Sequence, residues 1–311
     1  MNLSLPEYAP TSSSGVPCQS SSYTELMYIN STHRVLLVVL TGIISLLGVT
    51  ANSAVIYSII KLSLNRNHSM NLILVLSISD LSVNLVVLPC FIWSLLSTYT
   101  CVNVSVMEFT GQGLAHLTCY ITGIIGYDRY LRMKYLNGYP RIVTFSKIST
   151  VLSIVCFLSL FQGGAYLWGI HHNSYDLVST ISSMYDSIVI FFIALPYILL
   201  GKSIRTYRRE STHHNILQHV DQSVNKIAFR IIIVIWSLYT PYITMLAIRR
   251  FLPSESPLKK DALFGFILLT SYLFVYANSF VNSIIFLSIN TACRRCVHSI
   301  FAQETTVQSA T

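Results

Sequence analysis

Residues 35–60 read VLLVVLTGIISLLGVTANSAVIYSII, and this stretch decides the fold class of the chain. It holds 26 residues and no charge, whereas about 20 apolar residues already let a helix cross the hydrocarbon core of a bilayer. Because the bilayer core offers no water to the backbone, a spanning segment must be a helix or part of a closed barrel. A barrel strand is shorter and alternates in polarity, so the stretch predicts a transmembrane helix.

Six further runs of this kind follow along the chain. The predicted spans are about 35–60, 70–95, 109–127, 148–169, 179–201, 231–248 and 262–288. The sequence therefore predicts an all-α integral membrane protein, a seven-transmembrane helix bundle over residues 35–288. Residues 1–34 are expected to be an extracellular segment without a cleavable signal peptide, because they lack an apolar core. Residues 289–311 are expected to form a short amphipathic helix and a cytoplasmic tail.

The composition agrees with a membrane protein. Of the 311 residues, 53% are hydrophobic and 10% are charged, whereas soluble domains carry about 25% charged residues. The mean hydropathy is +0.59. These values argue against a soluble enzyme, a disordered protein and a disulfide-rich scaffold, and no cofactor loop or nucleophile motif points to an enzyme. The net charge of +8 is interpreted as a membrane-orientation signal and not as a nucleic-acid footprint.

The distribution of basic residues predicts the orientation. With the amino terminus outside, fifteen of the 20 Lys and Arg residues fall on the inner side, as the positive-inside rule requires. Glycosylation sequons then fall outside at Asn2, Asn30 and Asn103, and a fourth, at Asn67, falls inside. Cys293 and Cys296 have zinc-like spacing, but no second pair accompanies them, so no metal site is expected.

Several polar residues lie inside the predicted spans. Asp80 is the clearest, since an ionisable group in the hydrocarbon region is costly and is a functional candidate by default. The other polar residues at middle depth are Asn52, Thr118, Asn278, Ser279 and Asn282. One carboxylate with several oxygen atoms suits a monovalent cation or a buried water network. The alternative is that these side chains only hold helices together.

Short motifs occur in order in these spans. They are GVTANSAV at 48–55, LSISD at 76–80, Pro89, DRY at 128–130, Pro196, Pro241 with Tyr242, and NSFVNSIIF at 278–286. Over residues 35–301 this series resembles the rhodopsin-like (class A) family of G-protein-coupled receptors. The resemblance implies a plasma-membrane receptor that binds an extracellular small molecule or short peptide. It also implies partners: a heterotrimeric G protein, membrane lipid and, through the tail, arrestin.

The resemblance further implies an inner switch. In the resting state Arg129 would pair with Asp128 and Asp221, and agonist would favour a state in which the sixth span swings outward about Pro241. The implied switch residues are Asp128, Arg129, Tyr130, Asp221, Tyr239, Pro241, Asn282 and Phe286. The polar residues at middle depth match the family's sodium and water site, centred on Asp80. Cys293 and Cys296 are candidates for palmitoylation, or are ordinary free thiols.

The resemblance also bears on the ligand. No lysine stands at the family's retinal position, which is Tyr276, and Gly111 replaces the aspartate that binds amines, so retinal is excluded and an amine is disfavoured. The outer cavity is expected to be lined by Tyr239 together with Glu108, Gln112, His116, Tyr242, Tyr272 and Tyr276. That mixture of aromatic rings and neutral donors suits many small ligands.

Some positions depart from the family pattern. Tyr239 replaces a tryptophan, Ser283 a proline and Phe286 a tyrosine, which keeps open a receptor-fold protein with weak or no G-protein coupling, such as a decoy or heteromer partner. A transporter is the less favoured alternative, because the span count is odd and no internal repeat is visible. The family's outer disulfide partner is also missing, and a bridge between Cys18 and Cys101 is the hypothesis in its place.

Overall fold

The computed structural model of the chain describes residues 29–64, 68–96, 101–135, 138–172, 174–210, 234, 237–249, 251–252 and 256–308. Every regular element within these ranges is a helix. The helices are α2 (Ser31–Lys61), α3 (His68–Ser82), η2 (Val83–Val87), α4 (Leu88–Leu96), α5 (Cys101–Lys134), α6 (Tyr139–Ile142), α7 (Phe145–His171), α8 (Tyr175–Glu210), η3 (Pro257–Lys260), α10 (Ala262–Ile289) and α11 (Thr291–Gln308). Residues 237–249 are also helical.

Four of the described helices are long and apolar enough to cross a membrane. They are Ser31–Lys61, His68–Leu96, Phe145–Gly169 and Ala262–Ile289. The chain is therefore a helical membrane protein, and the predicted first, second, fourth and seventh spans coincide with these helices. The third, fifth and sixth predicted spans fall on α5, on α8 and on helical residues 237–249.

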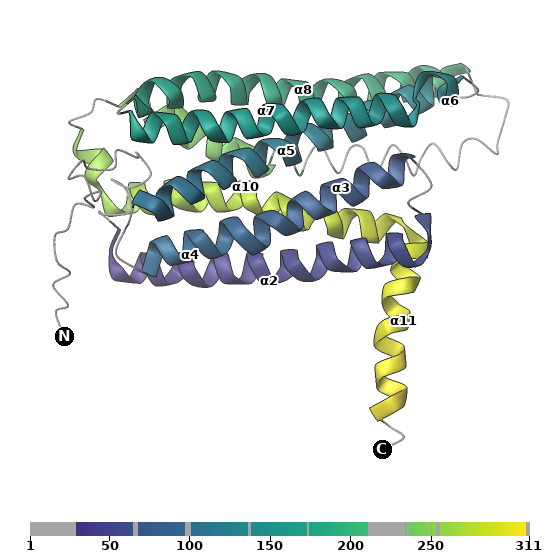
Figure 1. The fold of residues 1–311 in the computed structure, drawn as a ribbon, viewed down its shortest axis with the longest axis horizontal. Coiled ribbons are helices and arrows are strands. Elements are labelled where there is room, and N and C mark those ends of the chain that lie inside the picture. The colour runs from purple at the N-terminus through teal and green to yellow at the C-terminus, as the bar shows by residue number, and fades with distance from the viewer. Residues whose placement is uncertain are drawn as a thin grey trace.

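The long helices lie side by side in one bundle (Figure 1). From α2 to α8, successive long helices run in alternating directions along it. Helix α5 crosses the middle of the bundle and packs on α3, α7 and α8, whereas α10 packs chiefly on α2. Helix α11 leaves the end of α10 nearly at right angles to the bundle, and it occupies the place of the predicted amphipathic helix.

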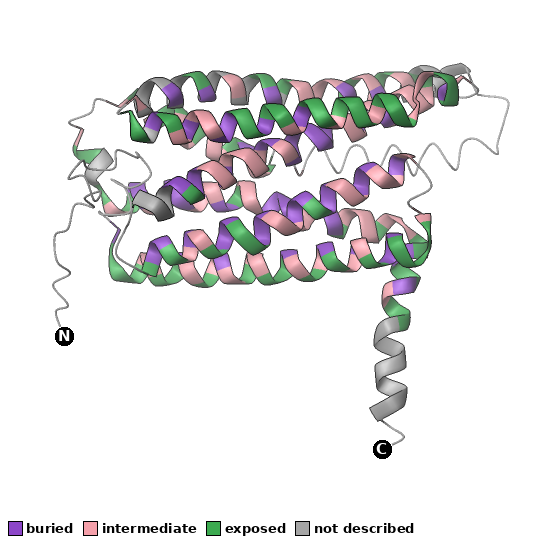
Figure 2. Ribbon diagram, viewed as in Figure 1, coloured by how far each residue is buried: buried purple, intermediate pink, exposed green. Residues whose placement is uncertain are grey.

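The bundle is apolar on its outside. Large apolar side chains on α2 and α7 face outward, among them Leu46 and Phe157, which are 69% and 67% exposed. Figure 2 shows exposed residues along the outer faces of these two helices. Such an apolar surface is unfavourable in water and matches the lipid tails of a bilayer. Polar residues lie inside instead, where Asn52, Asp80 and Asn84 are fully buried.

The second membrane helix contains a π-helical turn, η2, at its middle. Within η2 the backbone N–H of Leu88 donates to the carbonyl of Val83, five residues earlier. Pro89 follows at once, and because proline has no N–H and its ring crowds the preceding turn, the regular pattern is interrupted here. The π-helical turn carries Asn84, whose side chain is fully buried against α2.

Gly48 of α2 makes room for Asn84. A Cβ atom at position 48 would overlap the Asn84 side-chain amide. The Asn84 amide nitrogen donates to the Asp80 carbonyl at 2.6 Å and to the Ser279 hydroxyl at 2.9 Å, so it is held in place and has little room to move. Gly48 therefore sets how closely α2 approaches the second membrane helix.

We expect Gly48→Ala to lower the stability of the folded protein by about 1–3 kcal/mol, as for overpacked cores. The measurement is thermal unfolding of the purified full chain in lipid nanodiscs. Gly42→Ala, on the same helix, is the matched control because a Cβ there meets no atom within 4 Å. The double variant Gly48→Ala/Asn84→Ala should recover part of the loss. Equal unfolding temperatures for Gly48→Ala and Gly42→Ala would contradict this account.

Candidate functional site

The predicted polar residues meet in the middle of the bundle, around Asp80 of α3. The Asp80 carboxylate is fully buried. Its Oδ1 accepts a hydrogen bond from the Thr118 hydroxyl of α5 at 3.0 Å, and its Oδ2 accepts a longer one, 3.3 Å, from the Asn282 amide of α10. The Ser79 hydroxyl lies 3.2 Å from the Thr118 oxygen. Two helices, α5 and α10, thus direct a hydroxyl and an amide to this carboxylate of α3.

A second branch of the network joins α2 to α10. The Asn52 amide nitrogen donates to the Gly48 carbonyl at 2.8 Å and to the Ser279 carbonyl at 3.1 Å. The Ser283 hydroxyl donates to the Asn52 side-chain oxygen at 2.6 Å. This hydrogen bond joins α10 directly to the buried Asn52 side chain of α2.

Sequence analysis predicted Asn52, Asp80, Thr118, Asn278, Ser279 and Asn282 for this site, and all six are in the described part of the bundle. It missed Asn84, which lies between Asp80 and Ser279. The signal was present, because Asn84 follows Asp80 by four residues and so lies on the same helix face one turn away. No sequence pattern indicates the contact of Ser79 with Thr118, which are 39 residues apart.

The site combines one carboxylate with several uncharged oxygen atoms. The described hydrogen-bond partners of the Asp80 carboxylate are a hydroxyl and an amide, and neither carries a positive charge. The side-chain oxygen of Asn278 is buried and accepts no hydrogen bond from the described residues. A buried carboxylate without a positive partner needs a proton or a cation, and oxygen donors of this kind suit a hard cation.

At one end of α5, Asp128 anchors the short helix α6. Its two carboxylate oxygens accept hydrogen bonds from Ser69, at 2.6 Å, and from the Tyr139 hydroxyl. Arg132 completes the cluster, donating to the Ser69 hydroxyl at 2.8 Å and lying 4.7 Å from the centre of the Tyr139 ring. Burial and the Asp128 contact raise the pKa of the Tyr139 hydroxyl, so it remains a neutral donor throughout the physiological range.

This arrangement differs from the expected pairing of Arg129 with Asp128. No ion pair joins these two described side chains, and the Asp128 oxygens accept hydrogen bonds from Ser69 and Tyr139 instead. Arg129 instead lines a cavity of about 410 Å³ together with Tyr197, Asn282 and Phe286. Asp221, the other expected partner, lies outside the described residues. Tyr130 packs against the hydrophobic core between α5, α7 and α8.

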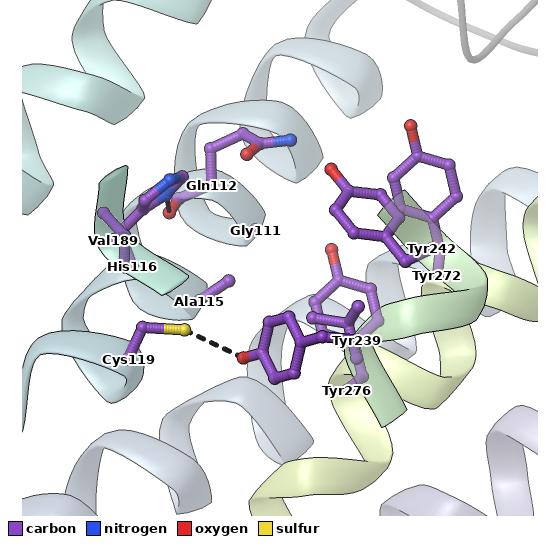
Figure 3. A pocket seen from close by; sticks show the side chains of 11 residues that line it. Gly111, Gln112, Ala115, His116, Cys119, Val189, Tyr239, Tyr242, Tyr272 and Tyr276 are labelled. Atoms are coloured by element: carbon purple, nitrogen blue, oxygen red, sulfur yellow. Dashed lines mark hydrogen bonds between the residues drawn. The ribbon is translucent and has the colours of Figure 1, made fainter. Parts of the chain in front are cut away.

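In the first half of α5, aromatic residues surround a small pocket of about 40 Å³ (Figure 3). It is lined by Gln112, His116, Tyr239, Tyr242, Tyr272 and Tyr276, among others. The Tyr239 hydroxyl points to the Cys119 sulfur at 2.8 Å. A second cavity, of about 30 Å³, shares Gln112, Tyr272 and Tyr276 and adds Glu108. The structure thus brings together all the residues predicted for the ligand pocket.

The predicted modification sites have mixed surroundings. Asn30 caps α2, with its side-chain oxygen accepting from the His33 N–H at 2.8 Å. Cys293 and Cys296 are both buried, and burial raises the pKa of the Cys293 thiol. Because acylation needs an accessible sulfur, an acyl chain on Cys293 would require α11 to move. Asn2 and Cys18 lie outside the described residues, as do the side chains of Cys101 and Asn103 in the first turn of α5.

The sequence matches no protein-family model and no curated protein sequence. The function is therefore argued from the residues and their geometry.

We expect Tyr139→Phe to loosen α6 by removing the hydrogen bond to Asp128 while keeping the ring and its contact with Arg132. A hydrogen bond to a charged group contributes about 1.5–3 kcal/mol, so amide exchange over residues 139–143 should become about tenfold faster or more. Hydrogen exchange of the full chain, followed by mass spectrometry, measures this directly. Tyr135→Phe is the control, because Tyr135 is exposed. Unchanged exchange in α6 would contradict the role given to Tyr139.

Proposed function

We propose that this chain is a G-protein-coupled receptor of the rhodopsin-like class. The observation that carries the proposal is the position of three polar sites along one helix. Helix α5 provides Gln112 to the tyrosine-lined pocket, Thr118 to the Asp80 network and Arg129 to the cavity at the opposite end. At 1.5 Å per residue, Gln112 and Arg129 lie about 25 Å apart along the helix. A signal between the two faces of a membrane needs such a connection.

The proposal requires seven spans, with α5, α8 and the helix containing residues 237–249 added to the four apolar membrane helices. Both α5 and α8 exceed the length needed to cross a bilayer, with 34 and 36 residues. They also lie within the same bundle as the other membrane helices. In this arrangement the amino terminus is outside and the protein resides in the plasma membrane. The tyrosine-lined pocket faces out, and Arg129 and α11 face the cytoplasm.

In the proposed mechanism, a small extracellular ligand binds among the tyrosines and changes the position of Tyr239. Tyr239 contacts Cys119 of α5, so this movement alters the contact between α5 and the sixth span. Pro241, two residues further on, interrupts the helical hydrogen bonds there and provides a hinge. Ligand binding thus shifts the population toward a state with a wider inner cavity. A heterotrimeric G protein, or arrestin, would then contact Arg129.

We further propose sodium as a modulator at Asp80. The residues that would hold it are Asp80, Thr118 and Ser79, whose oxygen atoms adjoin one another. Helix α10 would add Asn282, which contacts Asp80, and Asn278, one turn before it. The cation would supply the positive charge that the described partners of Asp80 lack. By neutralising this carboxylate it would stabilise the packing of α3, α5 and α10, which disfavours movement of these helices.

A receptor-fold protein with weak coupling is the second candidate function. Three positions favour it: Tyr239, Ser283 and Phe286. Ser283 is hydrogen-bonded to Asn52, which adds a contact between α2 and α10 where the family has a proline. Phe286 lines the inner cavity without a hydroxyl group, so it cannot join a water-mediated contact there. Both features would hold the chain in its resting arrangement.

For the receptor, we expect nucleotide exchange above the level of empty membranes on at least one Gα class. Arg129→Ala should reduce the exchange to the empty-membrane level, and Asp221→Ala should raise it. The control is Arg141→Ala, an exposed basic residue of α6, which should keep the wild-type rate. The measurement is guanine-nucleotide binding in membranes with verified surface expression. If wild type and all variants equal empty membranes, the weakly coupling alternative replaces the proposal.

For the sodium site, we expect sodium chloride to raise the unfolding temperature of the full chain by a few degrees relative to potassium chloride at the same ionic strength, because a ligand stabilises the state that binds it. Asp80→Asn should abolish the increment. Asp261→Asn serves as the control, since Asp261 is exposed and only caps α10. Asparagine keeps the oxygen that caps α10, so that variant should unfold near the wild-type temperature and still respond to sodium. An equal response of Asp80→Asn and wild type would rule out this site.

A further inference from the structure

A groove lies where the chain turns from α10 into α11. Helix α10 ends at Ile289, and α11 begins at Thr291 and runs crosswise to the bundle (Figure 1). The groove has a volume of about 290 Å³. It is lined by Ile284, Leu287 and Ser288 from α10 and by Arg294, Val297 and His298 from α11. None of these residues belongs to the three polar sites described above.

The groove has an apolar floor and a basic rim. Ile284, Leu287 and Val297 supply the floor, and Ile284 is 48% exposed. Arg294 and His298 are exposed and lie four residues apart, on the same face of α11. One Arg294 nitrogen donates to the Ser288 carbonyl at 3.2 Å, which holds the guanidinium group at the rim. A guanidinium group has further N–H donors, in a planar arrangement that matches a phosphate group.

The charge around the groove has one sign. Residues 284–300 contain Arg294, Arg295 and His298 and no acidic residue. No acid in this segment balances a cationic group, so a headgroup with a net negative charge suits the rim better than one with no net charge. An anionic group is the complement of this rim. The apolar floor adds a second requirement, because a free phosphate ion would leave it uncovered.

The position of the groove along the membrane normal indicates that it lies in the lipid headgroup layer. Because α10 is one of the membrane helices, its last turn lies at the edge of the hydrocarbon core, where a crosswise helix meets the headgroup layer. Basic pockets at this depth bind anionic headgroups. From this geometry we infer that the groove binds an anionic phospholipid, with its phosphate at Arg294 and His298 and an acyl chain over Ile284, Leu287 and Val297. The inference does not depend on the receptor function.

The test is native mass spectrometry of the full-length, delipidated protein titrated with phosphatidylserine or phosphatidylcholine of the same acyl chains. We expect wild type to bind phosphatidylserine more tightly. Each basic group near an anionic surface contributes about fivefold in affinity, so Arg294→Gln should weaken phosphatidylserine binding about fivefold and Arg294→Gln/His298→Gln further. Arg141→Gln, which removes an exposed charge from α6, should bind as wild type does. All the variants change exposed positions, and unfolding curves would verify that they fold.

Two further experiments distinguish binding of the whole lipid from binding of its phosphate group alone. Inorganic phosphate in excess should leave phosphatidylserine bound, because it cannot cover the apolar floor. Ile284→Ser should weaken phosphatidylserine binding while Arg294 remains in place. The inference is overturned if phosphatidylcholine binds as tightly as phosphatidylserine, if Arg141→Gln loses as much affinity as Arg294→Gln, or if phosphate displaces the lipid.

Discussion

The buried carboxylate of Asp80 is the constraint on which the rest of the bundle depends. A carboxylate at this depth has no bulk water to donate hydrogen bonds to it, so the protein must provide the donors. They come from two other helices, as Thr118 of α5 and Asn282 of α10. These hydrogen bonds fix the rotation and the depth of three helices relative to one another. Gly48 and Asn84 extend the same requirement to α2, because the Asn84 amide needs the space that a side chain at Gly48 would take.

The sites along α5 follow from this constraint. Once Thr118 faces Asp80, the helical repeat turns Gln112 toward the tyrosine-lined pocket and Arg129 toward the inner cavity. Asn282 belongs both to the Asp80 network and to the lining of that cavity. A change in the packing around Asp80 therefore reaches the surface proposed for the G protein. The residues that line the groove between α10 and α11 are not part of this network.

The outcome for individual residues shows where sequence reasoning was sufficient. The residues predicted for the ligand pocket line two adjoining cavities, and their role as a ligand site stays a prediction. In the structure Asp128 has partners other than the expected Arg129. The adjacent arginine was the obvious candidate, but hydroxyls from Ser69 and Tyr139 take both carboxylate oxygens. Ser69 is 59 positions away in the chain, and no local pattern indicates that contact. The burial of Cys293 was missed for the same reason.

Hydropathy along the chain is enough to identify a helical membrane protein and to locate its apolar helices. Backbone groups in a bilayer must be satisfied within the segment itself, so length and hydropathy are enough to identify such a helix. Only the tertiary structure decided which polar groups meet. Asn84 reaches Ser279 of α10, Ser283 reaches Asn52 of α2, and Tyr139 reaches Asp128 of α5. These contacts depend on how closely and at what rotation the helices pack, and side-chain volume between distant segments sets both.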